Sequence, residues 1–171
     1  MFSVEDISKR LSKSQILKYA ATTNNHPTGI TSILSWMDND NVEVIKNAAW
    51  IMGHAGESKP EQLSSHFNQL QYLLHHAKHP AVSRNILRVL QHTTIPEDNK
   101  GEVYTTCLDF ILDPKVPVAI RAFSMTVCAK ISKEHPELKN ELLLALSTIE
   151  TNGTPGIKSR IKNTLKQLKP L

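Results

Sequence analysis

The chain has 171 residues, of which 40% are hydrophobic and 21% charged, so its composition excludes a disordered, collagen-like or membrane-spanning protein. The chain has only 6 glycines, which tight hairpin turns require, and only 5% aromatic residues, which are common in strands. This composition favours an all-α fold. The formal net charge of +4 belongs to one end, because residues 1 to 150 carry 15 Lys and Arg against 16 Asp and Glu, whereas residues 151 to 171 carry 5 basic side chains and no acid.

Prolines and polar loops divide the chain into helices. The prolines suit the first helical turn, or the residue just before it, where a missing N–H leaves no helical hydrogen bond unmade. Residues 4 to 11 and 14 to 23 are expected to form an N-terminal helical cap. Four helical hairpins are expected to follow: 27 to 37 with 42 to 55, 60 to 77 with 80 to 92, 97 to 112 with 117 to 133, and 136 to 150 with 155 to 168.

Two columns of charged residues repeat with a period of 37 to 38 residues. The basic column occupies the second helix of each predicted hairpin and consists of Lys46, Arg84, Arg121 and Lys158. Eight residues before each basic position stands a second column: Asp38, His76, Asp113 and Glu150. Each hairpin has an apolar stripe too broad to bury alone, so neighbouring hairpins are expected to stack into a solenoid, an α-α superhelix.

The segment from Asp38 to Gly53 resembles the second helix of a HEAT repeat, and the periodicity of the resemblance covers residues 27 to 168. This resemblance implies a right-handed superhelix and a ladder in which each inter-helix acid bonds the basic residue of a neighbouring repeat. We therefore expect one domain over residues 1 to 171, with a cap at 1–26, repeats at 27–153 and a basic capping helix at 154–171. In the ladder, Arg121 is expected to pair with Asp113 or with the equivalent acid of an adjacent repeat.

The whole chain is also similar to small bacterial HEAT-like proteins of unsettled function, some of which have been called adenylosuccinate lyase. That activity is not expected here, because the Ser-rich signature loop of such lyases is absent. The single Ser-Ser pair, Ser64 and Ser65, lies in an amphipathic helix.

Few residues suggest metal or redox chemistry. His75 and His79 have the spacing at which two imidazoles can bind one metal, but Pro80 ends the helix before the second of them. Cys107 and Cys128 lie in apolar helical stretches and are expected to be reduced core residues. We therefore predict no metal and no cofactor, and a cytoplasmic location with no membrane span.

The tryptophans raise the one specific chemical alternative. Trp36 and Trp50 lie on the two helices of one hairpin, and aromatic residues on a HEAT-like stack can hold a nucleobase. The alkylpurine DNA glycosylases of HEAT-like fold use Trp, Asp and Arg in a basic cleft. With the amphipathic basic helix at the C-terminus, this resemblance makes a nucleic-acid-binding protein or a diverged glycosylase the alternative function.

No nucleophile motif, phosphate loop or metal-binding motif occurs, so no catalytic residue is predicted, although a site assembled from distant repeats leaves enzymatic activity open. The favoured hypothesis is a non-catalytic scaffold that binds a protein or peptide along the concave face of the stacked second helices. Its candidate contact residues share faces with the repeat columns: Asn47, Trp50, Arg88 and Ser124.

Overall fold

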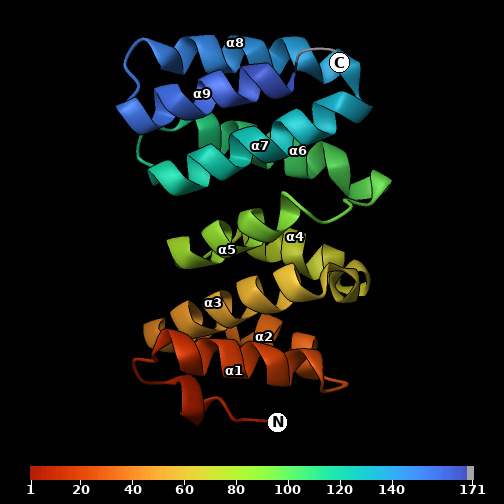
Figure 1. Ribbon diagram of the computed structural model, residues 1–171, viewed down its shortest axis with the longest axis vertical. Helices are drawn as coiled ribbons and strands as arrows, with labels where there is room; N and C mark the ends of the chain where they lie inside the picture. Colours follow the sequence, from red (N-terminus) through yellow and green to blue (C-terminus); the bar gives the residue numbers. More distant parts are fainter. Residues whose placement is uncertain (169–171) are drawn as a thin grey trace. The chain divides into compact units, whose positions relative to one another are not determined.

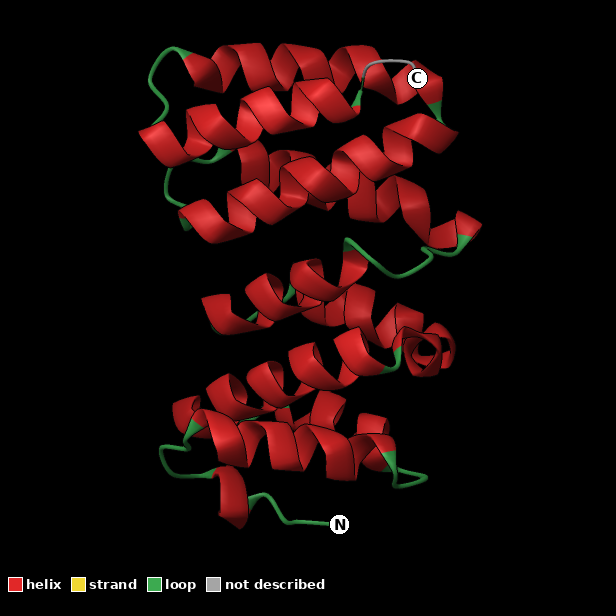
Figure 2. Cartoon of the chain, in the orientation of Figure 1, coloured by secondary structure: helices red, strands yellow, loops and turns green. Residues whose placement is uncertain are grey.

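The computed structural model describes residues 1–168, and residues 169–171, the end of the predicted basic segment that includes Lys169, lie outside the described part. Within the described residues every regular element is a helix (Figure 2), which confirms the predicted all-α fold. Two compact units are present, one formed by Met1–Asn99 and one that begins at Lys100.

The first unit stacks its helices in two layers (Figure 1). Helix α3 packs against α1 on one side and α5 on the other, and α2 and α4 cover the back of this layer. We call α1, α3 and α5 the second-helix layer of this unit, and α2 and α4 its first-helix layer. The elements are η1 (Glu5–Ile7), α1 (Lys13–Asn24), α2 (Gly29–Trp36), α3 (Val42–Ser58), η2 (Pro60–His66), α4 (Phe67–His75) and α5 (Pro80–Leu90).

The second unit repeats the hairpin arrangement. Helix α7 packs against α8 and α9, and α8 packs against α9. Here α7 and α9 are the second helices and α6 and α8 the first helices. The elements are α6 (Glu97–Leu112), which begins at the boundary between the units, α7 (Val118–Glu134), η3 (Pro136–Leu138), α8 (Lys139–Glu150) and α9 (Pro155–Gln167).

The helix starts follow the local sequence, with one exception near the N-terminus. Pro60, Pro80 and Pro155 lie in the first turns of η2, α5 and α9, as predicted. The helix expected over residues 4 to 11 is instead the short 3-10 turn η1. A capping box lies further on: Ser12 accepts from the Gln15 N–H, and the Gln15 side chain accepts from the Ser12 N–H, so α1 begins there.

Two glycines of α3 allow the close approach of α5. A Cβ atom at Gly53 would lie 2.6 Å from Asn85 Oδ1, and one at Gly56 would lie 2.8 Å from Leu63 Cδ1 and 3.0 Å from Val89 Cγ1. Because Gly53 faces Asn85 and Gly56 faces Val89, one turn further along both helices, α3 and α5 run parallel. This register determines which side chains of the two helices lie side by side.

We predict that Gly56→Ala lowers the free energy of unfolding by about 1–3 kcal/mol, because the new methyl group overpacks the contact with Leu63 and Val89. Gly101→Ala is the matched control: no atom lies within 4 Å of its added Cβ, so the substitution should leave stability unchanged or raise it by up to about 1 kcal/mol. Urea denaturation followed by circular dichroism measures both. Equal effects would contradict the close α3–α5 packing.

Candidate functional site

Helix α3 is buried except along one line of side chains. From Glu43 to Glu57, five residues reach water and all the rest are buried. The five recur every three or four positions, which places them on a single stripe. They are Glu43, Lys46, Trp50, His54 and Glu57. Neighbouring helices α1, α2 and α5 cover the rest of α3.

Helix α5 has a similar exposed line, formed by Ala81, Arg84 and Arg88 and continued by Gln91 beyond the helix end. The α3–α5 register places this line beside that of α3, with Glu57 near Arg88 and Trp50 near the turn that contains Arg84. The two lines together form one surface of the first unit, which we call the α3–α5 surface.

The two lines are joined by a charged cluster. The Arg88 guanidinium donates to both carboxylate oxygens of Glu57, with Nε 2.5 Å from Oε1 and Nη2 bonded to Oε2. Arg88 Nη2 also lies 3.4 Å from His54 Nδ1, and the His54 ring centroid lies 6.3 Å from that of Trp50. A bidentate pair of this kind fixes the orientation of the guanidinium plane.

His54 is held in its neutral form by its surroundings. Burial lowers the pKa of His54 below its usual 6.5, the positive charge of Arg88 lowers it further, and the opposing effect of Glu57 is smaller. Because Arg88 can only donate, Nδ1 of the neutral ring accepts its hydrogen bond. The ring hydrogen is therefore on Nε2, where it can be donated to another group.

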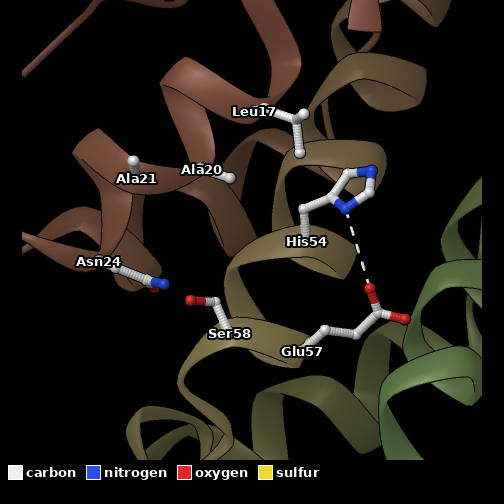
Figure 3. A pocket seen from close by; sticks show the side chains of 7 residues that line it. All are labelled: Leu17, Ala20, Ala21, Asn24, His54, Glu57 and Ser58. Carbon is white, nitrogen blue, oxygen red and sulfur yellow. Dashed lines mark ion pairs between the residues drawn. The ribbon is translucent and has the colours of Figure 1, made fainter. Parts of the chain in front are cut away.

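A pocket of about 370 Å³ lies next to this cluster, between α1 and the C-terminal half of α3 (Figure 3). Its apolar wall comes from α1, and its polar groups come mainly from α3. The lining residues are Leu17, Ala20, Ala21, Asn24, His54, Glu57 and Ser58.

Asn24 lines the pocket and carries a buried oxygen atom without a hydrogen-bond donor. Its side chain is only 8% exposed, and its amide nitrogen donates to the Ala55 carbonyl at 3.0 Å, which fixes the orientation of the amide. Within the described residues, Oδ1 of Asn24 has no hydrogen-bond partner. A buried acceptor without a donor is unfavourable, so Oδ1 of Asn24 is a local cost to stability beside the pocket.

Of the four predicted contact residues, the structure brings Trp50 and Arg88 together at this cluster. Asn47 is 5% exposed and donates to the main-chain carbonyls of Ile7 at 2.9 Å and Lys9 at 2.8 Å, so it anchors the N-terminal segment to α3. Ser124 is completely buried in the second unit. Neither Asn47 nor Ser124 lines a surface, which corrects the sequence prediction for these two positions.

The tryptophans do not share an environment. The Trp36 ring lies 5.7 Å from that of Phe2, whereas the Trp50 ring lies beside His54. Both side chains are partly exposed. Only Trp50 therefore belongs to the charged cluster.

The basic column occupies equivalent positions but has no common partner. Lys46 and Arg84 are the fifth residues of α3 and α5, and Arg121 and Lys158 are the fourth residues of α7 and α9. Arg121 is buried and donates Nε and Nη2 to the Ile111 carbonyl at 3.0 and 2.8 Å.

The predicted pair of Arg121 with Asp113 is not found in residues 1–168. The carbonyl of Ile111 lies in the last turn of α6, where helical N–H partners are missing, and the guanidinium supplies them. Asp113 instead accepts from the main-chain N–H of Lys115 at 2.8 Å. Its carboxylate stabilises the turn between α6 and α7.

The other acids of the second column also have different roles. Asp38 accepts from Lys78 at 3.2 Å in the next hairpin, and Lys46 pairs with Glu43 at 2.6 Å on its own helix. Three further members of the two columns are exposed and form no ion pair within the described part of the chain: Arg84, Glu150 and Lys158. Lys78, the partner of Asp38, belongs to the neighbouring repeat, as the resemblance implies. The residue of the basic column in that repeat is Arg84, not Lys78.

Sequence reasoning missed His54 and Glu57. The helix predicted over residues 42 to 55 ends before Glu57 and has His54 in its last turn. Their spacing of four and seven residues after Trp50 places them on the same face of α3 as Trp50, and this periodicity is the signal that could have identified them.

Residues 1–168 contain neither a metal-binding cluster nor a membrane-spanning helix. None of these residues forms a group of three or more His, Cys, Asp or Glu that could hold a metal ion. Among the described helices, none has both the length and the apolar character needed to cross a membrane.

Comparison with known proteins identifies a repeat domain. A family model described as HEAT repeat domain matches residues 4–168, nearly the whole chain. No curated protein matches the chain significantly. No solved structure matches it significantly either.

We predict that Arg121→Ala lowers the free energy of unfolding by about 2–4 kcal/mol, because it removes two charged hydrogen bonds and leaves a buried carbonyl without a donor. Asp113→Ala should cost less than about 1 kcal/mol, since it affects only a surface turn. The double mutant, measured by urea denaturation, should be additive within about 0.5 kcal/mol. A larger coupling would show that the two residues interact directly.

His54 is expected to make stability depend on pH. Since its folded-state pKa lies below 6.5, the unfolded chain binds this proton more readily, and the contribution of His54 is complete above about pH 6.5 and is lost as pH falls through the folded-state pKa. Urea midpoints measured between about pH 7.5 and pH 5 should fall less in His54→Gln than in the unmodified protein. The exposed His92→Gln serves as control, and an unchanged pH dependence in His54→Gln would refute the assignment.

Proposed function

Because the chain belongs to the HEAT repeat family, whose stacked helical hairpins are scaffolds suited to protein interaction, we propose that it is a non-catalytic module that binds a protein or peptide on its second helices. The α3–α5 surface and the adjoining pocket form the binding site. Residues 27–153 act in this proposal as one run of repeats between the terminal segments 1–26 and 154–171.

The observation that carries the proposal is the combination of a partly exposed tryptophan with a fixed arginine at the edge of a pocket. Trp and Arg are the residue types that contribute most to protein interfaces, particularly when they surround a place that a partner side chain can fill. Trp50 supplies apolar area, and Arg88 is already oriented by Glu57 before any partner binds. Little side-chain entropy is therefore lost when a partner binds.

The same geometry supports binding over catalysis. His54 Nδ1 faces Glu57 and Arg88, whereas the Ser58 hydroxyl points toward Asn24 (Figure 3). Ser58 and His54 are therefore not arranged as a nucleophile and its base. Both oxygens of the Glu57 carboxylate are bonded to Arg88, so neither is free to act on a substrate.

The test is selection from a library of random displayed peptides with the immobilised protein, followed by affinity measurements on the selected peptides. Trp50→Ala should weaken their binding at least about tenfold, because the aromatic anchor is lost. Tyr72→Ala is the matched control: Tyr72 is an exposed aromatic residue of the first-helix layer, with 55% of its surface accessible, and its removal should change affinity less than about twofold.

Three outcomes would contradict the proposal. These are a library that yields no peptide, selected peptides that depend on Tyr72 instead of Trp50, and a purified protein that turns over a small molecule while binding no peptide. The first and third would remove the peptide-binding function, and the second would move the binding site to the first-helix layer.

A further inference from the structure

In each unit the first helices and the second helices differ in charge, and the difference is largest in α6 to α9. The second helices α7 and α9 carry seven basic residues and one acid, whereas the first helices α6 and α8 carry two basic residues and six acids. The basic residues of α7 and α9 are Arg121, Lys130, Lys133, Lys158, Arg160, Lys162 and Lys166, and their one acid is Glu134.

The first unit has the same polarity. Its second helices α1, α3 and α5 carry five basic residues against two acids, whereas α2, η2 and α4 contain no Lys or Arg and one acid, Glu61. The charged residues of the second helices are Lys13, Lys18, Lys46, Arg84 and Arg88, with Glu43 and Glu57. Positive charge in each unit is therefore concentrated on the layer to which we assign binding.

Arg84 is the available cation of the α3–α5 surface. Lys46 is paired with Glu43 and Arg88 with Glu57, but the exposed side chain of Arg84 forms no ion pair or hydrogen bond within residues 1–168. It lies one helical turn before Arg88 on the same face of α5. Its guanidinium can therefore donate hydrogen bonds to a carboxylate without breaking an existing interaction.

The Arg88–Glu57 pair shows the kind of contact that Arg84 can form. Glu57 from α3 binds Arg88 from α5 through both carboxylate oxygens, in the planar geometry that guanidinium groups favour. A carboxylate brought by a partner to Arg84 meets the same donor geometry one turn away. The pocket lined by Leu17, Ala20 and Ala21 offers apolar surface beyond His54.

We infer that the partner is an acidic protein segment, with a carboxylate bound to Arg84 and an apolar side chain packed against Trp50 or in the pocket. The inference rests on the proposed function and adds the chemistry of the partner. Electrostatic complementarity with the positive second-helix layer would orient the segment and speed its association.

Two features favour a protein segment over a nucleic acid. Glu43 and Glu57 on the α3–α5 surface are already paired with Lys46 and Arg88, so within residues 1–168 this surface offers the unpaired cation Arg84, which suits a single carboxylate better than a continuous phosphate backbone. The apolar wall formed by Leu17 and Ala21 can bury a hydrophobic side chain but cannot stabilise a charged phosphate group.

The test begins with the composition of the peptides selected from the random library and continues with a synthetic probe. The selected peptides should be enriched in Asp and Glu, and a fluorescein-labelled peptide that alternates Glu with Leu should bind in an anisotropy titration. Arg84→Glu should weaken this binding at least about tenfold. Lys115→Glu changes the net charge equally but lies in the loop between α6 and α7, and it should weaken binding less than about twofold.

Each opposing result has its own meaning. If the library yields Trp50-dependent peptides without enrichment in acidic residues, or if Arg84→Glu binds the probe normally, the acidic partner is refuted and the binding function remains. If the library yields no peptides, the binding function itself fails.

Tighter, Arg84-dependent binding of a single-stranded DNA oligonucleotide would identify a nucleic acid as the ligand. Sedimentation of the unmodified protein as an oligomer that Arg84→Glu dissociates would identify a second copy as the occupant.

Discussion

The close packing of α3 on α5 is the constraint on which the candidate site depends. Gly53 and Gly56 have no side chains, so Asn85 and Val89 approach the backbone of α3 directly. The parallel register that results brings Glu57 and His54 within hydrogen-bonding distance of Arg88, and the Trp50 ring lies beside His54. A larger side chain at either glycine would separate the helices and disperse these groups.

Burial of α3 on several sides has a second consequence. Because α1, α2 and α5 surround this helix, only one stripe of its side chains reaches water, and polar groups on that stripe are fixed by their neighbours. His54 is kept neutral by burial and by Arg88, which lower its pKa, and Arg88 is fixed by Glu57. The site is therefore rigid before a partner binds, which reduces the entropy lost on association.

The sequence was sufficient to predict the repeated hairpins, because a 37-to-38-residue period and prolines at helix starts are local signals. The sequence placed Trp50 and Arg88 among the candidate contact residues but did not show which face of α3 stays open, so the buried Asn47, next to the exposed Lys46, was placed on the surface as well. Hydrogen bonds from side chains to main-chain carbonyls could not be predicted from the sequence either. Nothing in the residues around Arg121 indicates that it binds the Ile111 carbonyl instead of Asp113. Such a contact depends on how the end of α6 meets α7 in three dimensions.

The most direct test of the account is a chemical-shift map of the isotope-labelled protein titrated with a peptide selected from the library. The account predicts that the largest changes fall on the indole N–H of Trp50 and on the amides around His54, Arg84 and Arg88, with small changes in α2 and α4. Changes concentrated on the first-helix layer, for example around Tyr72, would contradict the assignment of binding to the second helices.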